Sequence, residues 1–197
     1  MNSPRRHPLI AALTLAVAAA LPALQACTTA VAAPVPMQRG DAAIDPPGRV
    51  ARLSEVQGSV WLYHPDDGEW VAAERNRPLT SGDRLATDGG ARSELRLGST
   101  VLRLDGATEI EVLRLDDERL ALRLHNGSLA LRIRGNDQAS GFELHTEEGR
   151  FTVQRPGRYR FDRDDAASFA TVLSGQAYYE TQNNALTINA GQRAEFW

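Results

Sequence analysis

A period-two pattern of apolar and charged residues dominates the second half of the sequence. Between Glu94 and Ile133, leucine, isoleucine or valine alternates with arginine or glutamate along several short runs. Successive side chains of a β-strand point to opposite faces, so this alternation predicts strands with one face in a core and the other in water. Helical periodicity is close to absent. We therefore expect an all-β fold, either an antiparallel two-sheet sandwich or a short β-roll.

Turn residues punctuate the alternating runs. Asn126-Gly127 is the strongest hairpin signal, because a type I′ turn needs positive φ at both central positions. Five other dipeptides predict further turns: Gly98-Ser99, Asp105-Gly106, Asp116-Asp117, Pro156-Gly157 and Gly175-Gln176. The alternation changes phase between Ile110 and Leu120, where a β-bulge or a change of sheet would restore it.

Residues 1–26 are typical of an export signal. Arg5 and Arg6 precede an apolar stretch, residues 8–24, in the order that a signal peptide shows. This stretch nearly reaches the roughly 20 residues that a membrane helix needs, so a retained anchor is the alternative. Pro22 and the small residues after it favour cleavage. We expect an exported bacterial protein, periplasmic or associated with the outer membrane.

Cys27 is the single cysteine of the chain and ends the sequence LQAC. This pattern is similar to the bacterial lipobox, whose cysteine becomes lipid-modified, although Gln25 is unusual at its position. The alternative is ordinary cleavage near Ala33, which removes Cys27 with the signal. Stable anchoring takes two or more acyl chains, so we expect membrane attachment only through such a lipid or an uncleaved signal. One cysteine forms no intramolecular disulfide.

The rest of the chain divides into a linker and one domain. Residues 27–48 are rich in alanine and proline and are typical of a flexible tether, which leaves residues 49–197 as the folded domain. The whole chain has 22 basic and 25 acidic side chains, and every basic one is arginine. No run of five basic residues occurs, so the sequence argues against a nucleic-acid partner.

The sequence GDRLATDGGARSELRLGSTVLRLD, residues 82–105, resembles the motif of the FecR-type domain family. That motif has Gly-Asp, an apolar residue, Thr, a glycine-containing corner, alternating leucines, Gly-Ser and another leucine strand. The matching polar and glycine positions are Gly82, Asp83, Thr87, Arg92, Gly98 and Ser99. The resemblance continues through Gly127, Gly175, Gly191 and Gln192 and covers residues 49–197.

The resemblance implies a non-catalytic all-β domain outside the cytoplasm that binds another envelope protein, in interaction or signalling. In the family these motif residues are structural, and Asp83 is expected to cap its own turn. The family's namesakes control a sigma factor through a cytoplasmic segment. Here seven residues precede the apolar stretch, and RPGRYRFD, residues 155–162, departs from the family's pattern, so direct sigma-factor control is not expected.

Signals for catalysis or metal binding are weak. His64, His125 and His145 are scattered, whereas a metal site needs clustered ligands. No nucleophile elbow occurs, and the paired aspartates lack the spacing of a calcium loop. We expect no enzyme activity, no metal and no cofactor.

Three aromatic residues form a candidate ligand surface. Trp61 and Tyr63 share one face of a predicted strand, and Trp70 follows the turn sequence PDDGEW. Exposed rings would suit a carbohydrate- or peptidoglycan-binding module, which is the alternative function, whereas buried rings would pack a core. Packing in the core or across strands is the favoured interpretation.

Outward-facing arginines form a possible ladder across neighbouring strands: Arg96, Arg103, Arg123 and Arg132, opposed by Glu94, Glu109 and Glu111. A ladder of this kind can receive an anionic partner. Cross-strand ion pairing and protection of a sheet edge explain it equally well.

Overall fold

The computed structural model describes residues 49–197. These residues form one short helix and fourteen strands: β1 Ala51–Gln57, β2 Val60–Tyr63, β3 Trp70–Ala72, β4 Pro78–Leu79, β5 Arg84–Thr87, β6 Arg92–Leu97, β7 Thr100–Leu104, β8 Thr108–Leu115, β9 Leu120–Ile133, α1 Asn136–Ser140, β10 Phe142–His145, β11 Arg150–Arg163, β12 Ser168–Glu180, β13 Ala185–Asn189 and β14 Arg193–Phe196. The predicted all-β fold is confirmed. All fourteen strands belong to one sheet, and one of its pairings, β9 with β10, is parallel.

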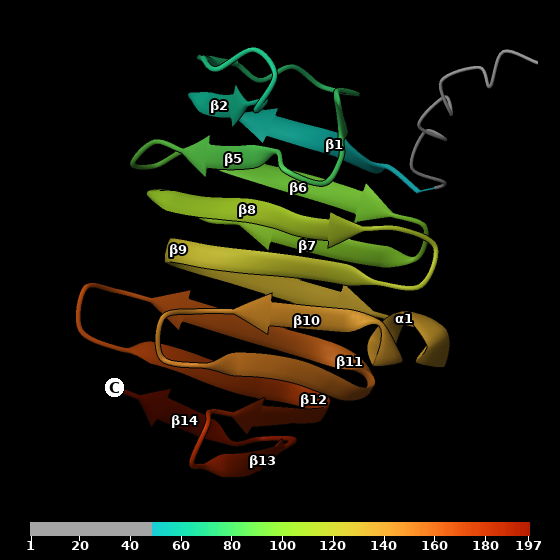
Figure 1. The fold of residues 1–197 in the computed structure, drawn as a ribbon, viewed down its shortest axis with the longest axis vertical. Coiled ribbons are helices and arrows are strands. Elements are labelled where there is room, and N and C mark those ends of the chain that lie inside the picture. Colours follow the sequence, from blue (N-terminus) through green and yellow to red (C-terminus); the bar gives the residue numbers. More distant parts are fainter. Residues whose placement is uncertain (1–48) are drawn as a thin grey trace, which may run out of the picture. The chain divides into compact units, whose positions relative to one another are not determined.

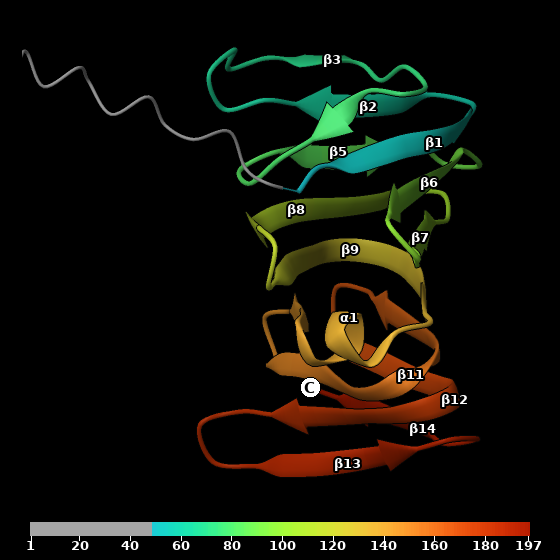
Figure 2. The same cartoon turned by 90° about the vertical axis from the view of Figure 1, so that its right-hand side faces the viewer.

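The sheet is folded over so that two layers enclose a core, with strands stacked along the long axis (Figures 1 and 2). Layer A contains β3, β2, β5, β8, the first half of β9, β10, the first half of β11, the second half of β12 and β13. Layer B contains β4, β1, β6, β7, the second half of β9, the second half of β11, the first half of β12 and β14.

Three strands are long because each runs through both layers. The first half of β9 pairs with β8 and β10, and its second half pairs with β7 and β11. The crossings lie at or beside Asn126-Gly127, Pro156-Gly157 and Gly175-Gln176. The turns predicted at these three dipeptides are therefore wrong, since each strand continues and only bends. Gly127 and Gly175 have φ of +90° and +97° at two of these bends, a region that side chains with a Cβ rarely adopt.

The other three predicted turns and the predicted bulge are present in the structure. Gly98-Ser99, Asp105-Gly106 and Asp116-Asp117 each lie between two consecutive strands. The register of β8 against β9 shifts between Val112 and Arg114, so the predicted bulge is confirmed. It restores the inward direction of Leu115, which is buried.

The core is aliphatic in its first part and aromatic near the end of the stack. Leucines from β1, β2, β5, β6 and β7 fill the space between the layers, with exposures of 3% or less. Farther along, Phe151 packs against Phe161, Tyr179 and Phe196, with ring centroids 4.8–5.3 Å apart. Burial of these side chains supplies the main stabilisation of the fold, because the domain has no cysteine for a disulfide.

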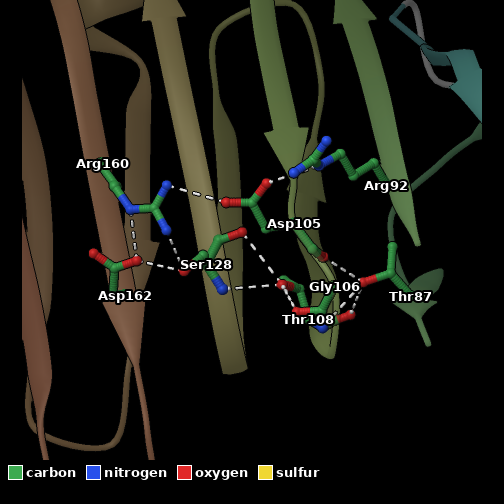
Figure 3. A network of polar contacts seen from close by, with 8 residues as sticks. All are labelled: Thr87, Arg92, Asp105, Gly106, Thr108, Ser128, Arg160 and Asp162. Atoms are coloured by element: carbon green, nitrogen blue, oxygen red, sulfur yellow. Dashed lines mark hydrogen bonds and ion pairs between the residues drawn. The ribbon is translucent and has the colours of Figure 1, made fainter. Parts of the chain in front are cut away.

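A ladder of hydroxyl groups joins the turns along one side of the stack (Figure 3). The Thr87 hydroxyl donates to the carbonyl of Asp105 at 2.6 Å and accepts from the backbone N–H of Thr108 at 3.0 Å. The Thr108 hydroxyl in turn accepts from the N–H of Ser128 at 2.9 Å. At the points where the strands bend or reverse, these hydroxyl groups take the place of backbone partners. The buried backbone N–H and C=O groups there therefore still form hydrogen bonds.

We expect Thr87→Val to lower the free energy of unfolding by about 2 kcal/mol. Valine keeps the shape of the buried side chain but leaves the N–H of Thr108 and the carbonyl of Asp105 without this partner. Urea denaturation measures the loss. Thr171→Val, on a half-exposed outward position, is the control, and an equal loss in both variants would contradict the ladder's role.

Candidate functional site

An aromatic cluster of Trp61, Tyr63 and Trp70 lies on the outer face of layer A. Val60 and Leu62 point into the core, so the strand's alternation turns Trp61 and Tyr63 outward. Tyr63 lies directly opposite Trp70 in the register of β2 and β3, and their ring centroids are 5.5 Å apart. The predicted packing across strands is present for this pair, but none of the three rings belongs to the core.

The cluster is held in place and remains accessible. Trp61 and Trp70 keep 38% and 40% of their surface exposed. The indole N–H of Trp61 donates to a carboxylate oxygen of Asp88 at 3.2 Å. The guanidinium carbon of Arg84 lies 5.7 Å from the Trp70 ring centroid, within cation–π range, and Arg84 also pairs with Glu109. These contacts fix the rings before any ligand arrives.

A row of cross-strand neighbours continues from the cluster across layer A. From Trp70 and Tyr63 it passes through Arg84, Glu111, Arg123, His145 and Arg150 to Glu180. Its charged members form ion pairs with one another or with adjacent carboxylates, such as Arg123 with Glu111 at 3.4 Å and Arg150 with Glu143 at 3.3 Å. The aromatic cluster is therefore an apolar patch beside a row whose charged side chains are paired.

The arginines grouped by sequence lie on two different layers. Arg96, Arg103 and Arg132 belong to strands of layer B, whereas Arg123 lies on layer A. The four do not form one ladder, because β9 crosses between the layers and carries Arg123 and Arg132 to opposite faces. The acidic partners divide in the same way, with Glu94 on layer B and Glu109 and Glu111 on layer A.

Gly82 and Asp83 form the corner before β5. The Asp83 carboxylate is buried and accepts from the backbone N–H of Thr80 at 2.8 Å. It also bonds to the ring Nδ1 of His64, just after β2, a partner that the sequence did not predict. The N–H of Gly82 donates to the carbonyl of Val112 at 2.7 Å, which fastens this corner to β8.

The other residues of the motif lie at turns and bends. Arg92 starts β6 and approaches Asp105 at 3.5 Å, while Gly98 and Ser99 connect β6 to β7. The Gly191-Gln192 corner returns the chain from β13 to β14, with two backbone hydrogen bonds to Val172. Thr87 belongs to the ladder of hydroxyl groups. Gly127 and Gly175 lie at the bends of β9 and β12. The motif positions therefore lie at many points around both layers rather than in one cleft.

The His64–Asp83 contact predicts a pH-dependent stability. The hydrogen bond to Asp83 raises the pKa of His64 above its usual 6.5, against an opposing effect of burial; Asp66 also lies 3.5 Å from the ring. A raised pKa stabilises the fold fully below pH 6.5, and this stabilisation disappears as pH rises through the folded-state pKa.

We therefore expect the unfolding free energy of the wild type to exceed that of His64→Gln by more at pH 6 than at pH 8.5. The difference should be at most about 1 kcal/mol, because the ring is more than one third exposed. Urea denaturation at both values measures it. In Asp83→Asn, the same histidine substitution should show a much smaller pH dependence; an unchanged dependence would contradict the assignment to this pair.

Within residues 49–197 no three histidine, cysteine or acidic side chains gather as metal ligands would. Over this range no helix has the length and apolar character to cross a bilayer, since α1 has five residues. The predicted signal, Cys27 and the linker to residue 48 lie outside the described residues and stay predictions.

No protein-family model and no curated protein matches the chain. Two crystal structures of a "putative anti-sigma factor" from Parabacteroides distasonis, at 2.50 and 1.65 Å resolution, align with it at 12% and 11% identity and a TM-score of 0.49 each. The alignments cover 57% of this chain and 53% of those chains, so they span about half the length of those proteins. Similarity at this level carries no conclusion, and the FecR-type resemblance stays a prediction.

Proposed function

We propose that residues 49–197 form a non-catalytic binding domain of the bacterial cell envelope, which docks another envelope protein on the aromatic cluster. The observation that carries this proposal is the position of Trp61, Tyr63 and Trp70 on one outward sheet face. Tryptophan, tyrosine and arginine are the residues that contribute most to protein–protein interfaces, and Arg84 supplies the fourth member.

The geometry favours a preformed surface over a reactive site. Tyr63, Trp70 and Arg84 contact one another, and Asp88 orients Trp61. Rings whose orientation is already fixed lose little conformational entropy when a partner covers them.

The predicted export signal favours the envelope as the setting. The sequence of residues 1–26 predicts a signal, Cys27 is a candidate for lipid attachment unless it is removed with that signal, and the residues up to 48 predict a tether. A tethered domain held near a membrane meets envelope proteins at a raised effective concentration. Modest affinity at the aromatic cluster then suffices for function.

A glycan is the second candidate ligand, because partly exposed indole rings on a flat sheet face also stack on sugar rings. Titration of tryptophan fluorescence with peptidoglycan fragments and other envelope oligosaccharides tests this candidate. A saturable shift, together with calorimetric binding of the same glycan that Trp61→Ser/Trp70→Ser abolishes, would favour the glycan and contradict the protein-docking proposal. No shift at millimolar glycan supports a protein partner. Leu186→Ser, at an exposed apolar side chain on β13, is the control for nonspecific effects.

A further inference from the structure

Two arginines of layer B face each other directly without a compensating charge. Arg132 on β9 and Arg158 on β11 are register partners and both are exposed. Neighbouring strands lie about 4.8 Å apart, and like charges directly opposite each other destabilise a sheet. Within residues 49–197 neither guanidinium forms an ion pair. The fold therefore carries an electrostatic cost here that its own contacts do not offset.

The nearby arginines are already occupied. Arg96 and Arg103 both bind the Glu94 carboxylate, at 2.7 and 2.8 Å. Burial raises the pKa of Glu94, but the hydrogen bonds from Arg96, Ser54 and Arg103 lower it more, so the net shift is downward and Glu94 stays ionised. Arg160 similarly pairs with Asp105 and Asp162 on the neighbouring row (Figure 3). The arginine pair, Arg132 and Arg158, is a free cationic pair on this face.

A hollow of about 410 Å³ lies beside the arginine pair. Its lining includes Ala130, whose small side chain leaves room between longer neighbours, and two apolar side chains, Val101 and Leu173. Leu173 is 57% exposed and has no register partner in the pairing of β12 with β11. The hollow thus combines two free guanidinium groups with apolar walls.

We propose that this hollow binds an acidic, extended segment of a partner protein, with a carboxylate on the arginine pair and an apolar side chain against Val101 and Leu173. The planar guanidinium fork matches a carboxylate with two hydrogen bonds. An extended peptide places side chains of the same face about 6.7 Å apart, so acidic and apolar groups both reach the hollow. A flat membrane surface does not enter a concave site, and a nucleic-acid backbone offers nothing to the apolar walls.

This site is independent of the aromatic cluster, which lies on layer A. Calorimetric titration of the full chain tests it, with a capped nine-residue peptide that carries glutamate and leucine in turn at every second position, with alanine between them, so that both side chains lie on one face of the extended peptide. We expect saturable binding that Arg132→Gln/Arg158→Gln weakens at least tenfold. Arg77→Gln/Arg119→Gln removes the same charge from exposed positions outside the hollow and should change the affinity less than twofold. The glutamine version of the peptide should not bind.

The stability of the variant provides a second measurement. Because the substitutions remove a like-charge pair, Arg132→Gln/Arg158→Gln should unfold at the same urea concentration as the wild type or a higher one. Equal losses of peptide affinity in both double variants would overturn the proposal, as would binding to phosphatidylglycerol vesicles or inorganic phosphate without binding to the peptide. Absence of peptide binding by the wild-type chain would overturn it too.

Discussion

Gly175→Ala should lower the free energy of unfolding by about 3 kcal/mol, a large loss for the addition of one methyl group. Gly175 sits where β12 bends between the layers, with φ of +97°. An added Cβ would meet the hydroxyl of Tyr159 far inside van der Waals contact and the carbonyl of Pro156 at 2.9 Å. Tyr159 is 1% exposed and cannot move aside, so overpacking adds to the backbone strain.

Gly191→Ala is the matched control for this prediction. Gly191 has a similar φ of +83°, but a Cβ there would meet nothing within 4 Å. Gly191→Ala should lower the free energy of unfolding by about 1 kcal/mol, the cost of the left-handed conformation alone. Urea denaturation of both variants separates strain from collision. Equal losses in the two would show that Tyr159 does yield and that the bend is not tightly packed.

Phe151→Ala should cost about 4 kcal/mol, in the range found when a buried aromatic side chain is truncated. Phe151 is fully buried and lies between β10 and β12, where it contacts Phe161, Tyr179 and Phe196. Its removal leaves a cavity among three rings from β11, β12 and β14. Since these strands belong to both layers, the cavity weakens the closure of the stack at its C-terminal end.

Phe169→Ala serves as the comparison, because Phe169 points outward on β12 and contacts Arg193, whose guanidinium carbon is 4.6 Å from the ring. We expect this variant to lose about 1 kcal/mol. Thermal and urea unfolding should rank the variants in the same order. A Phe151→Ala loss as small as that of Phe169→Ala would mean that the aromatic end of the core is loosely packed.

The alternating leucines predicted the strands well, and the phase change at Leu113 correctly predicted a bulge. The local glycine signal at Gly127 and Gly175 predicts turns, because it looks the same at a turn and at a bend within a strand. What distinguishes them is pairing with distant strands: β9 meets β8 and β10 before its bend, and β7 and β11 after it. No local sequence pattern contains that information.

Trp61, Tyr63 and Trp70 were predicted as a candidate ligand surface, with packing in the core or across strands as the favoured interpretation. The alternation around Trp61 and Tyr63 showed that they share a face, yet whether that face is covered depends on which layer packs against it. The contact of His64 with Asp83 and the pairing of Arg132 with Arg158 join residues far apart in sequence. Period-two patterning gives the direction of each side chain, whereas the register between distant strands decides its neighbours.

The most direct test of the proposed function is photo-crosslinking in the native envelope. A benzoylphenylalanine at Ala72, directly opposite Trp61 in the register, probes the aromatic cluster, and the same group at Thr187, exposed on β13, is the control. We predict one defined protein adduct from position 72, and an adduct at least fivefold weaker from position 187. The substitutions Trp61→Ser/Trp70→Ser should remove the adduct from position 72. Equal adducts from both positions, or an adduct that survives the double substitution, would contradict docking on this cluster.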